Sequence, residues 1–136
     1  MTAHSVLGPM QAALYATLTG DPGFMALVKA VYDDVPEGGA FPYVTFGEGT
    51  ENSWDTFGGT GSDATITMHV WSRYKGYKEA QRINDAMIGL LDNQTGILLE
   101  GYGLVLLNFE NSVQLRDPDG ITRHIATRFR VMADAT

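Results

Sequence analysis

The first third of the chain carries apolar residues at helical spacing. Positions three or four residues apart predict a helix over about residues 9–18, ended by Gly20. Asp21-Pro22 then reads as an N-cap followed by proline at the first helical position, so we expect a second, short helix. The two stripes consist of Leu7, Met10, Leu14 and Leu18, and of Phe24, Leu27, Val28 and Val31. Both helices are predicted to face a core.

Two strands are predicted next. Residues 41–46 are rich in aromatic and β-branched types, and residues 63–72 alternate strictly between two kinds of side chain. In the second strand one face holds Ala64, Ile66, Met68 and Val70, and the other holds Thr65, Thr67, His69 and Trp71. This alternation is typical of a half-buried antiparallel strand.

Between these strands, residues 47–62 hold five glycines, three acidic residues and no basic residue, together with Trp54 and Phe57. A loop this long in a compact domain is usually functional or disordered. The two large aromatic side chains make disorder a poor explanation. We therefore predict a long glycine-rich, acidic loop with a role of its own.

The clearest amphipathic helix is predicted over residues 75–91, and a hairpin with a tight turn at Asp117-Pro118-Asp119-Gly120 follows it. The apolar face of this helix consists of Tyr77, Ala80, Ile83, Met87, Leu90 and Leu91. In the first hairpin strand Val105, Leu107, Phe109, Val113 and Leu115 share one parity, which predicts a common face. The return strand places Ile125, Phe129 and Val131 on one face and His124, Arg128 and Arg130 on the other.

These elements predict an α+β fold, a mostly antiparallel four-stranded sheet with long β-hairpins and helices packed on one face. No repeat or linker divides the sequence, so residues 1–136 are expected to form a single domain. The other sheet face is predicted to be either solvated or covered by another subunit. It carries His69, Trp71, His124, Arg128 and Arg130.

Composition and charge narrow the function. The chain is 44% hydrophobic and contains no cysteine, which excludes disulfides and thiolate metal sites. No run of about eighteen apolar residues occurs, so no membrane span is expected. The net charge is −7, whereas tight binding of nucleic acid needs many basic side chains on phosphates. The charge argues against a tight DNA binder but allows a surface along which DNA passes.

Two short motifs that resemble ligand sites have plainer explanations. Residues 59–64 fit the pattern G-x-G-x-x-A, but dinucleotide binding needs a strand before it and a helix after it. Asp117-Pro118-Asp119-Gly120 resembles the beginning of a calcium loop, but the twelfth position is Arg128 instead of glutamate. We interpret the first motif as the end of a loop and the second as a turn.

The titratable residues also give no positive sign of catalysis. His4, His69 and His124 lack the spacing of a helical metal pair, although His69 and His124 can approach each other across the sheet. The loop acids Glu48, Glu51 and Asp55 lack the rigid, desolvated setting that catalytic carboxylates need. We therefore predict no catalytic, cofactor-binding or metal site, and no enzymatic activity.

Two groups of side chains are candidates for contacts between subunits. Trp54 and Phe57 either fold back onto their own domain or insert into a neighbouring subunit, and the sequence favours neither. Arg128 and Arg130 are either solvated or paired with an acidic neighbour, for which residues 47–62 of the same or an adjacent chain are a candidate. The candidate interface residues are Trp54, Phe57, Arg116, Arg123, His124, Arg128 and Arg130.

Three segments are distinctive in their order and spacing. They are SVQLRDPDGITRH at 112–124, closing with Arg128-Phe129-Arg130, FPYVTFG at 41–47, and TMHVWS at 67–72, with an amphipathic helix after it. Over about residues 9–132 they resemble the tail completion, or tail terminator, proteins of long-tailed phages and gene transfer agents. The segment 47–62 is not part of this resemblance.

The resemblance implies a ring-forming subunit, commonly a hexamer. Such a ring binds the last ring of the tail tube protein, stops tube polymerisation and presents a surface to the head connector or neck proteins. DNA passes through its lumen without specific binding, and no cofactor or membrane is involved. The implied location is the tail or neck of a virion that is assembled in the host cytoplasm.

Two alternatives stay open. The first is another neck, connector or minor tail protein of the same kind of virion. The second is a small-molecule-binding α+β domain that uses the face with His69, His124 and Arg128. A pocket there would need polar groups that converge in a concave apolar setting.

Overall fold

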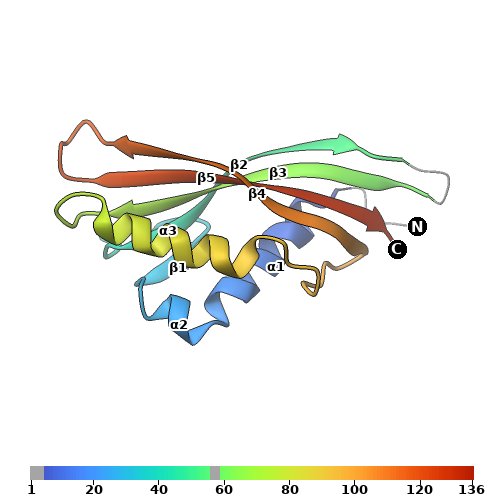
Figure 1. Cartoon of the computed structure of the whole chain (residues 1–136), viewed down its shortest axis with the longest axis horizontal. Coiled ribbons are helices and arrows are strands. Elements are labelled where there is room, and N and C mark those ends of the chain that lie inside the picture. Colours follow the sequence, from blue (N-terminus) through green and yellow to red (C-terminus); the bar gives the residue numbers. More distant parts are fainter. Residues whose placement is uncertain (1–4, 56–58) are drawn as a thin grey trace.

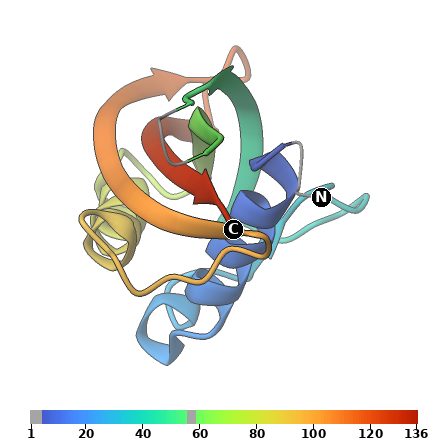
Figure 2. The same cartoon turned by 90° about the vertical axis from the view of Figure 1, so that its right-hand side faces the viewer.

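The structure, a computed structural model, describes residues 5–55 and 59–136 and has an α+β fold, as predicted. Its elements are α1 (Leu7–Thr19), α2 (Pro22–Met25), β1 (Ala30–Tyr32), β2 (Tyr43–Ser53), β3 (Gly61–Ser72), α3 (Lys78–Leu91), β4 (Tyr102–Arg116) and β5 (Arg123–Ala135). The five strands form one sheet in the order β1-β2-β3-β5-β4. The three helices lie on one face of this sheet (Figure 1), and an end-on view shows how strongly the strands twist (Figure 2).

The predicted four-stranded sheet is corrected to a five-stranded mixed sheet. The additional strand is β1, which pairs in parallel with β2, whereas the other pairs are antiparallel. Val31, expected on the stripe of the second helix, lies in β1 because α2 already ends at Met25. A strand of three residues is too short to leave a period in the sequence. It is created by hydrogen bonding to β2.

The predicted loop over residues 47–62 is also wrong for most of its length. β2 continues to Ser53 and β3 begins at Gly61, so these residues are largely the arm of a long β-hairpin. Thr50 lies opposite Thr65, and their hydroxyl groups are 2.7 Å apart. Strand formation depends on cross-strand pairing more than on local preference, which explains why a glycine-rich, acidic stretch is extended here.

The predicted common face of β4 is divided by two β-bulges, between Leu104 and Leu106 and between Phe109 and Asn111. Leu107 and Phe109 pair with the buried Val131 and Phe129, so they belong to the helix-covered face. After the second bulge, Val113 and Leu115 lie on the opposite face and are 49% and 42% exposed. One inserted residue reverses the direction of every later side chain, which residue parity in the sequence does not reveal.

The core lies between the helices and the covered face of the sheet. The α3 residues Ala80, Ile83, Met87 and Leu91 are buried, as their spacing predicted. They pack in one cluster with apolar residues of β3 and β5, including Met68 and Phe129. Within residues 5–55 and 59–136, no helix combines the length and the apolar content that crossing a bilayer requires.

Candidate functional site

The face of the sheet that carries no helix, called the open face here, gathers the side chains that the sequence placed together. In the register of β3 and β5, Trp71 lies opposite His124, Thr67 opposite Arg128, and Thr65 opposite Arg130. Residues that lie opposite each other in a sheet share a face. The predicted grouping of His69, Trp71, His124, Arg128 and Arg130 is therefore confirmed.

Four side chains on this face form a connected histidine cluster: Glu48, His69, Trp71 and His124. The Nδ1 atom of His69 is hydrogen-bonded to Nε2 of His124, and its Nε2 atom lies 2.7 Å from Oε1 of Glu48. The Trp71 ring stacks on His124 with 3.8 Å between ring centroids and an angle of 12° between the planes. Trp71 also donates its indole N–H to Oγ1 of Thr45 over 3.0 Å. The expected approach of the two histidines is thus confirmed.

Glu48 reaches this cluster because β2 is irregular between Phe46 and Gly49, where its register with β3 shifts. The residue before it must be glycine, since a Cβ atom at Gly47 would overlap the imidazole of His69. Sequence reasoning treated Glu48 as a solvated loop acid and missed this contact. The glycine beside it was the only signal, and it has this meaning only once the strand register is known.

When both histidines are neutral, each hydrogen bond within the cluster has one donor and one acceptor. Each histidine then has one N–H: His69 donates to Glu48, and His124 donates to the free ring nitrogen of His69. Burial, followed by the neighbouring His69, lowers the pKa of His124, while Asp117 and Glu48 oppose this shift. The hydrogen bond from His69 lowers the pKa of Glu48.

No metal site emerges around these histidines. In the described part of the chain, no group of three or more histidine, aspartate or glutamate side chains is arranged to hold a metal ion. The pattern at residues 59–64 also lies outside any nucleotide-binding arrangement, because Gly61 begins strand β3 instead of a helix.

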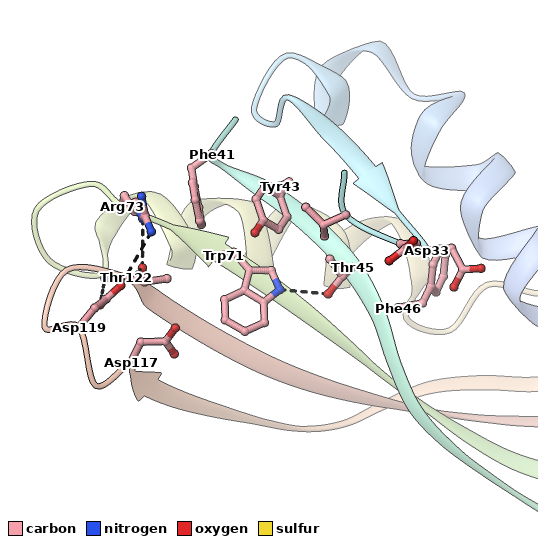
Figure 3. A pocket seen from close by; sticks show the side chains of 12 residues that line it. Asp33, Phe41, Tyr43, Thr45, Phe46, Trp71, Arg73, Asp117, Asp119 and Thr122 are labelled. Carbon is pink, nitrogen blue, oxygen red and sulfur yellow. Dashed lines mark hydrogen bonds and ion pairs between the residues drawn. The ribbon is translucent and has the colours of Figure 1, made fainter. Parts of the chain in front are cut away.

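An acidic cleft of about 420 Å³ adjoins the histidine cluster (Figure 3). It shares Trp71 with the cluster and is also lined by Thr45, the acceptor of the Trp71 N–H. Four carboxylates and four aromatic side chains line it: Asp33, Asp34, Asp117 and Asp119, and Phe41, Tyr43, Phe46 and Trp71. The guanidinium of Arg73 lies 4.4 Å above the centre of the Phe41 ring, and its Nη2 atom is 3.9 Å from Oδ2 of Asp119. The volume is in the range of ligand sites, but such sites are predominantly apolar. The cleft is better suited to a polar or cationic contact.

Asp119 in this cleft has a structural task. Its carboxylate accepts hydrogen bonds from the backbone N–H groups of Ile121 and Thr122 and from the Thr122 hydroxyl. These bonds lower the pKa of Asp119 to about 2, with those of Thr122 contributing most. Gly120 has a φ of +74°, which glycine adopts without strain. The predicted turn is therefore confirmed.

The basic side chains expected on the open face have acidic partners within the same chain. Arg130 binds Asp63 through two hydrogen bonds of 2.9 and 2.7 Å, and Arg128 binds Glu110 over 2.8 Å. Within the chain, the partners are therefore not the predicted acids of residues 47–62, and pairing with those acids of an adjacent chain stays a prediction. The bond to Arg130 also lowers the pKa of Asp63.

The other two candidate arginines face each other across the last hairpin. Arg116 lies opposite Arg123 in the register of β4 and β5. The Arg123 guanidinium donates to the carbonyl groups of Gly120 and Ile121 and lies 5.5 Å from the centre of the Tyr77 ring. Among the described residues, neither arginine forms an ion pair with a carboxylate.

The aromatic candidate Trp54 lies against Gly61 of its own chain. The backbone N–H of Trp54 donates to the carbonyl of Gly61, and the Trp54 ring lies so close to Gly61 that a Cβ atom there would be 3.1 Å from it. This contact favours the interpretation that Trp54 packs on its own chain. Phe57 lies outside the described residues.

The sequence profile of one protein family, Tail completion protein gp17, matches residues 12–134, which is nearly the whole chain. The chain belongs to this family. The resemblance inferred from the hairpin and strand motifs is thereby confirmed. The family consists of structural tail-completion proteins and is not known as a family of enzymes.

Solved structures agree with the family. A chain in the structure titled "Virion of native gene transfer agent (GTA) particle" superposes with a TM-score of 0.89 and 29% identity, covering 98% of this chain and 100% of that one. The structure titled "Structure of bacteriophage SPP1 gp17 protein" shares the fold, with a TM-score of 0.60 and 22% identity over 91% of this chain and 88% of that one. No curated protein sequence matches the chain. Family and neighbours together support a structural tail-completion role in a phage or gene transfer agent virion.

Proposed function

We propose that this tail completion protein forms a closed hexameric ring at the head-proximal end of a tail tube. There it stops tube polymerisation and joins the tail to the connector or neck proteins of the head. The observation that carries the proposal is the superposition on a chain of a gene transfer agent virion over 98% of this chain and the whole of that one. The ring assembles in the host cytoplasm and becomes part of the virion.

The charge of the chain is compatible with a channel for DNA. Six copies at −7 each carry about −42, and an excess of negative charge repels the phosphate backbone. In the described part of the chain, the open-face bases Arg128 and Arg130 are neutralised by Glu110 and Asp63. DNA therefore passes through such a ring without specific binding.

The candidate interface residues fit this proposal to different degrees. Arg116 is exposed, Arg123 lies beside it, and His124 stacks on Trp71 at the edge of the acidic cleft. Arg128 and Arg130 already have partners, so a change of sign there perturbs the chain itself before it perturbs a neighbour.

The deciding experiment is tail assembly in the presence and absence of this protein. With the protein, electron microscopy is expected to show tails of uniform length with a ring at one end that binds heads. Without it, tubes are expected to be over-long or unable to join heads. Incorporation along the length of the tube would instead identify a tube or minor tail protein, and tails that mature normally without the protein would contradict the proposal.

The role of the paired arginines needs a matched control. Arg128→Glu is expected to lower ring assembly, but it also breaks the pair with Glu110. The double change Arg128→Glu with Glu110→Arg keeps the pair and exchanges the two charges. If the double variant assembles like the parent, only the pair within the chain matters, and Arg128 is not an interface residue.

A further inference from the structure

The strand at one border of the sheet has an unused backbone edge. β4 is the last strand, and β5 is its only strand partner among the described residues. The middle of its outer side is covered: Asn93 N–H donates to the carbonyl of Leu107, and Phe109 N–H donates to Asp92. Beyond that point every residue from 110 to 116 is exposed. We call this stretch, residues 110–116, the free edge.

The direction of its backbone groups follows from the hairpin turn. Asp117 N–H donates to the carbonyl of Thr122, so Asp117 points toward β5. Bonded and non-bonded pairs alternate along antiparallel strands. The N–H and C=O groups of Ser112, Gln114 and Arg116 therefore point outward, away from the sheet. Such a row is a template for another strand.

The surfaces on either side of the free edge also suit an added strand. On the helix side, a groove of about 540 Å³ runs between α3 and β4, lined by residues that include Asn84, Ile88 and Gln114. On the open face, Val113 and Leu115 are 49% and 42% exposed. Side chains of an added strand alternate between the two faces, so one set would enter the groove and the other would cover the two apolar residues.

We propose that the free edge binds the outer part of β2, residues 46–53, from a second copy of this chain. The inference rests on the proposed ring. β1 pairs only with Tyr43, Val44 and Thr45, so the rest of β2 has no strand on its outer side within the described ranges. The two unused edges are of similar length. They lie on opposite sides of one sheet, so head-to-tail pairing of copies continues from subunit to subunit until the ring closes.

Charge favours the same partner. The free edge ends at Arg116, which lies beside Arg123 and has no carboxylate partner among the described residues. Residues 46–53 contain Glu48 and Glu51 and no basic residue. The Glu51 carboxylate already accepts hydrogen bonds from the Ser5 hydroxyl and the Val6 N–H, so Glu48 is the carboxylate that a neighbouring chain can reach. The Glu48 side chain is 80% exposed and so remains accessible to a neighbouring chain.

Gln114→Pro tests the backbone contact. Proline removes an outward N–H, which edge strands tolerate, and leaves the β4–β5 hydrogen bonds in place. The matched control Gln114→Ala loses the same side-chain bond to Gln81 but keeps the N–H. We expect the proline variant to reduce ring formation at least tenfold in sedimentation velocity, with tail tubes present, while the alanine variant assembles like the parent. Parental ring formation by a folded proline variant overturns the inference.

Cysteine cross-linking tests the partner strand without relying on proline. The chain has no cysteine of its own. Gln114→Cys, on the helix-covered side, is mixed with Ser53→Cys or Glu51→Cys, which lie on the same side of β2 opposite the buried Ser62 and Ala64. The mixture is oxidised under ring-forming conditions, and Gly89→Cys on α3 serves as the control. We expect disulfide-linked pairs that join position 114 to a β2 position. Links only between two copies of Gln114→Cys, or no links above the control, overturn the inference.

The two proposals can fail separately. Cross-linked rings that do not cap tail tubes would refute the proposed function and leave the strand pairing intact. Rings that cap tubes and form no β4–β2 links would refute the pairing and leave the function intact.

Discussion

Ile83 offers a direct test of the core. It lies on α3, is 1% exposed, and packs between the helix and the sheet. Ile83→Ala deletes three buried carbon groups worth roughly 0.8 kcal/mol each in transfer free energy. The cavity that remains raises the total loss to about 2–5 kcal/mol. Ile83→Val, which removes one group, is expected to cost about 1 kcal/mol.

Ile83→Asp is expected to have the largest effect. An unpaired carboxylate at a buried position costs several kcal/mol. The whole free energy of unfolding of a typical domain is only about 5–15 kcal/mol. The variant should therefore be largely unfolded at 37 °C or fail to accumulate as folded protein.

Urea unfolding followed by circular dichroism measures the series. Arg82→Ala is the control, because Arg82 is an exposed neighbour on the same helix and should change stability by less than about 0.5 kcal/mol. The expected order of stability is parent, valine, alanine and aspartate. If Ile83→Ala costs no more than Arg82→Ala, or if Ile83→Asp melts like the parent, the assigned packing of α3 is wrong.

Three further predictions concern the histidine cluster and the glycines. Because the pKa of His124 is lowered on folding, the unfolded chain binds the extra proton more readily. The contribution of His124 to the free energy of unfolding is therefore fully present above about pH 6.5, and it is lost as the pH falls toward the pKa of the folded state. Urea midpoints at pH 7.5 and 5.5 should show a smaller acid loss in His124→Asn than in the parent, and an equal loss would contradict this. Gly47→Ala should destabilise by about 1–3 kcal/mol in the same assay, because its Cβ overlaps His69; unchanged stability would show that the cluster is not packed as described. Gly89→Ala, an exposed helical position with no atom within 4 Å of the added Cβ, should stabilise by about 0.5–1 kcal/mol in thermal melts, and a loss there would contradict the assigned helix.

The elements that sequence periodicity predicted well are those whose pattern is local. The spacing of Ala80, Ile83 and Met87 identified both α3 and its buried face. The alternation in β3 placed His69 and Trp71 on the open face, and the same reasoning in β5 placed His124 there. Their approach to one another followed, since aligned neighbouring strands bring side chains of one face together.

The features that were mispredicted depend on pairing between distant segments. β1 exists only because three residues find β2, and residues 47–53 are extended because β3 lies beside them. A strand of three residues is too short to show a period, although Val31 and Tyr32 are strand formers, and the glycines and acids of residues 47–53 disfavour a strand. The contact of Glu48 with His69 needs both that pairing and the irregularity beside Gly47.

The sequence by itself determined the α+β class, the covered faces of α3, β3 and β5, and the family resemblance. Burial of an apolar face imposes a period that can be read along one segment. Tertiary structure alone decided the register: where β4 is bulged, which arginine meets which carboxylate, and that Val113 and Leu115 leave the core side for the open face. The physical reason is that one inserted residue has a small local cost but reverses the direction of every later side chain. The insertion can be recognised only from the pairing with the neighbouring strand.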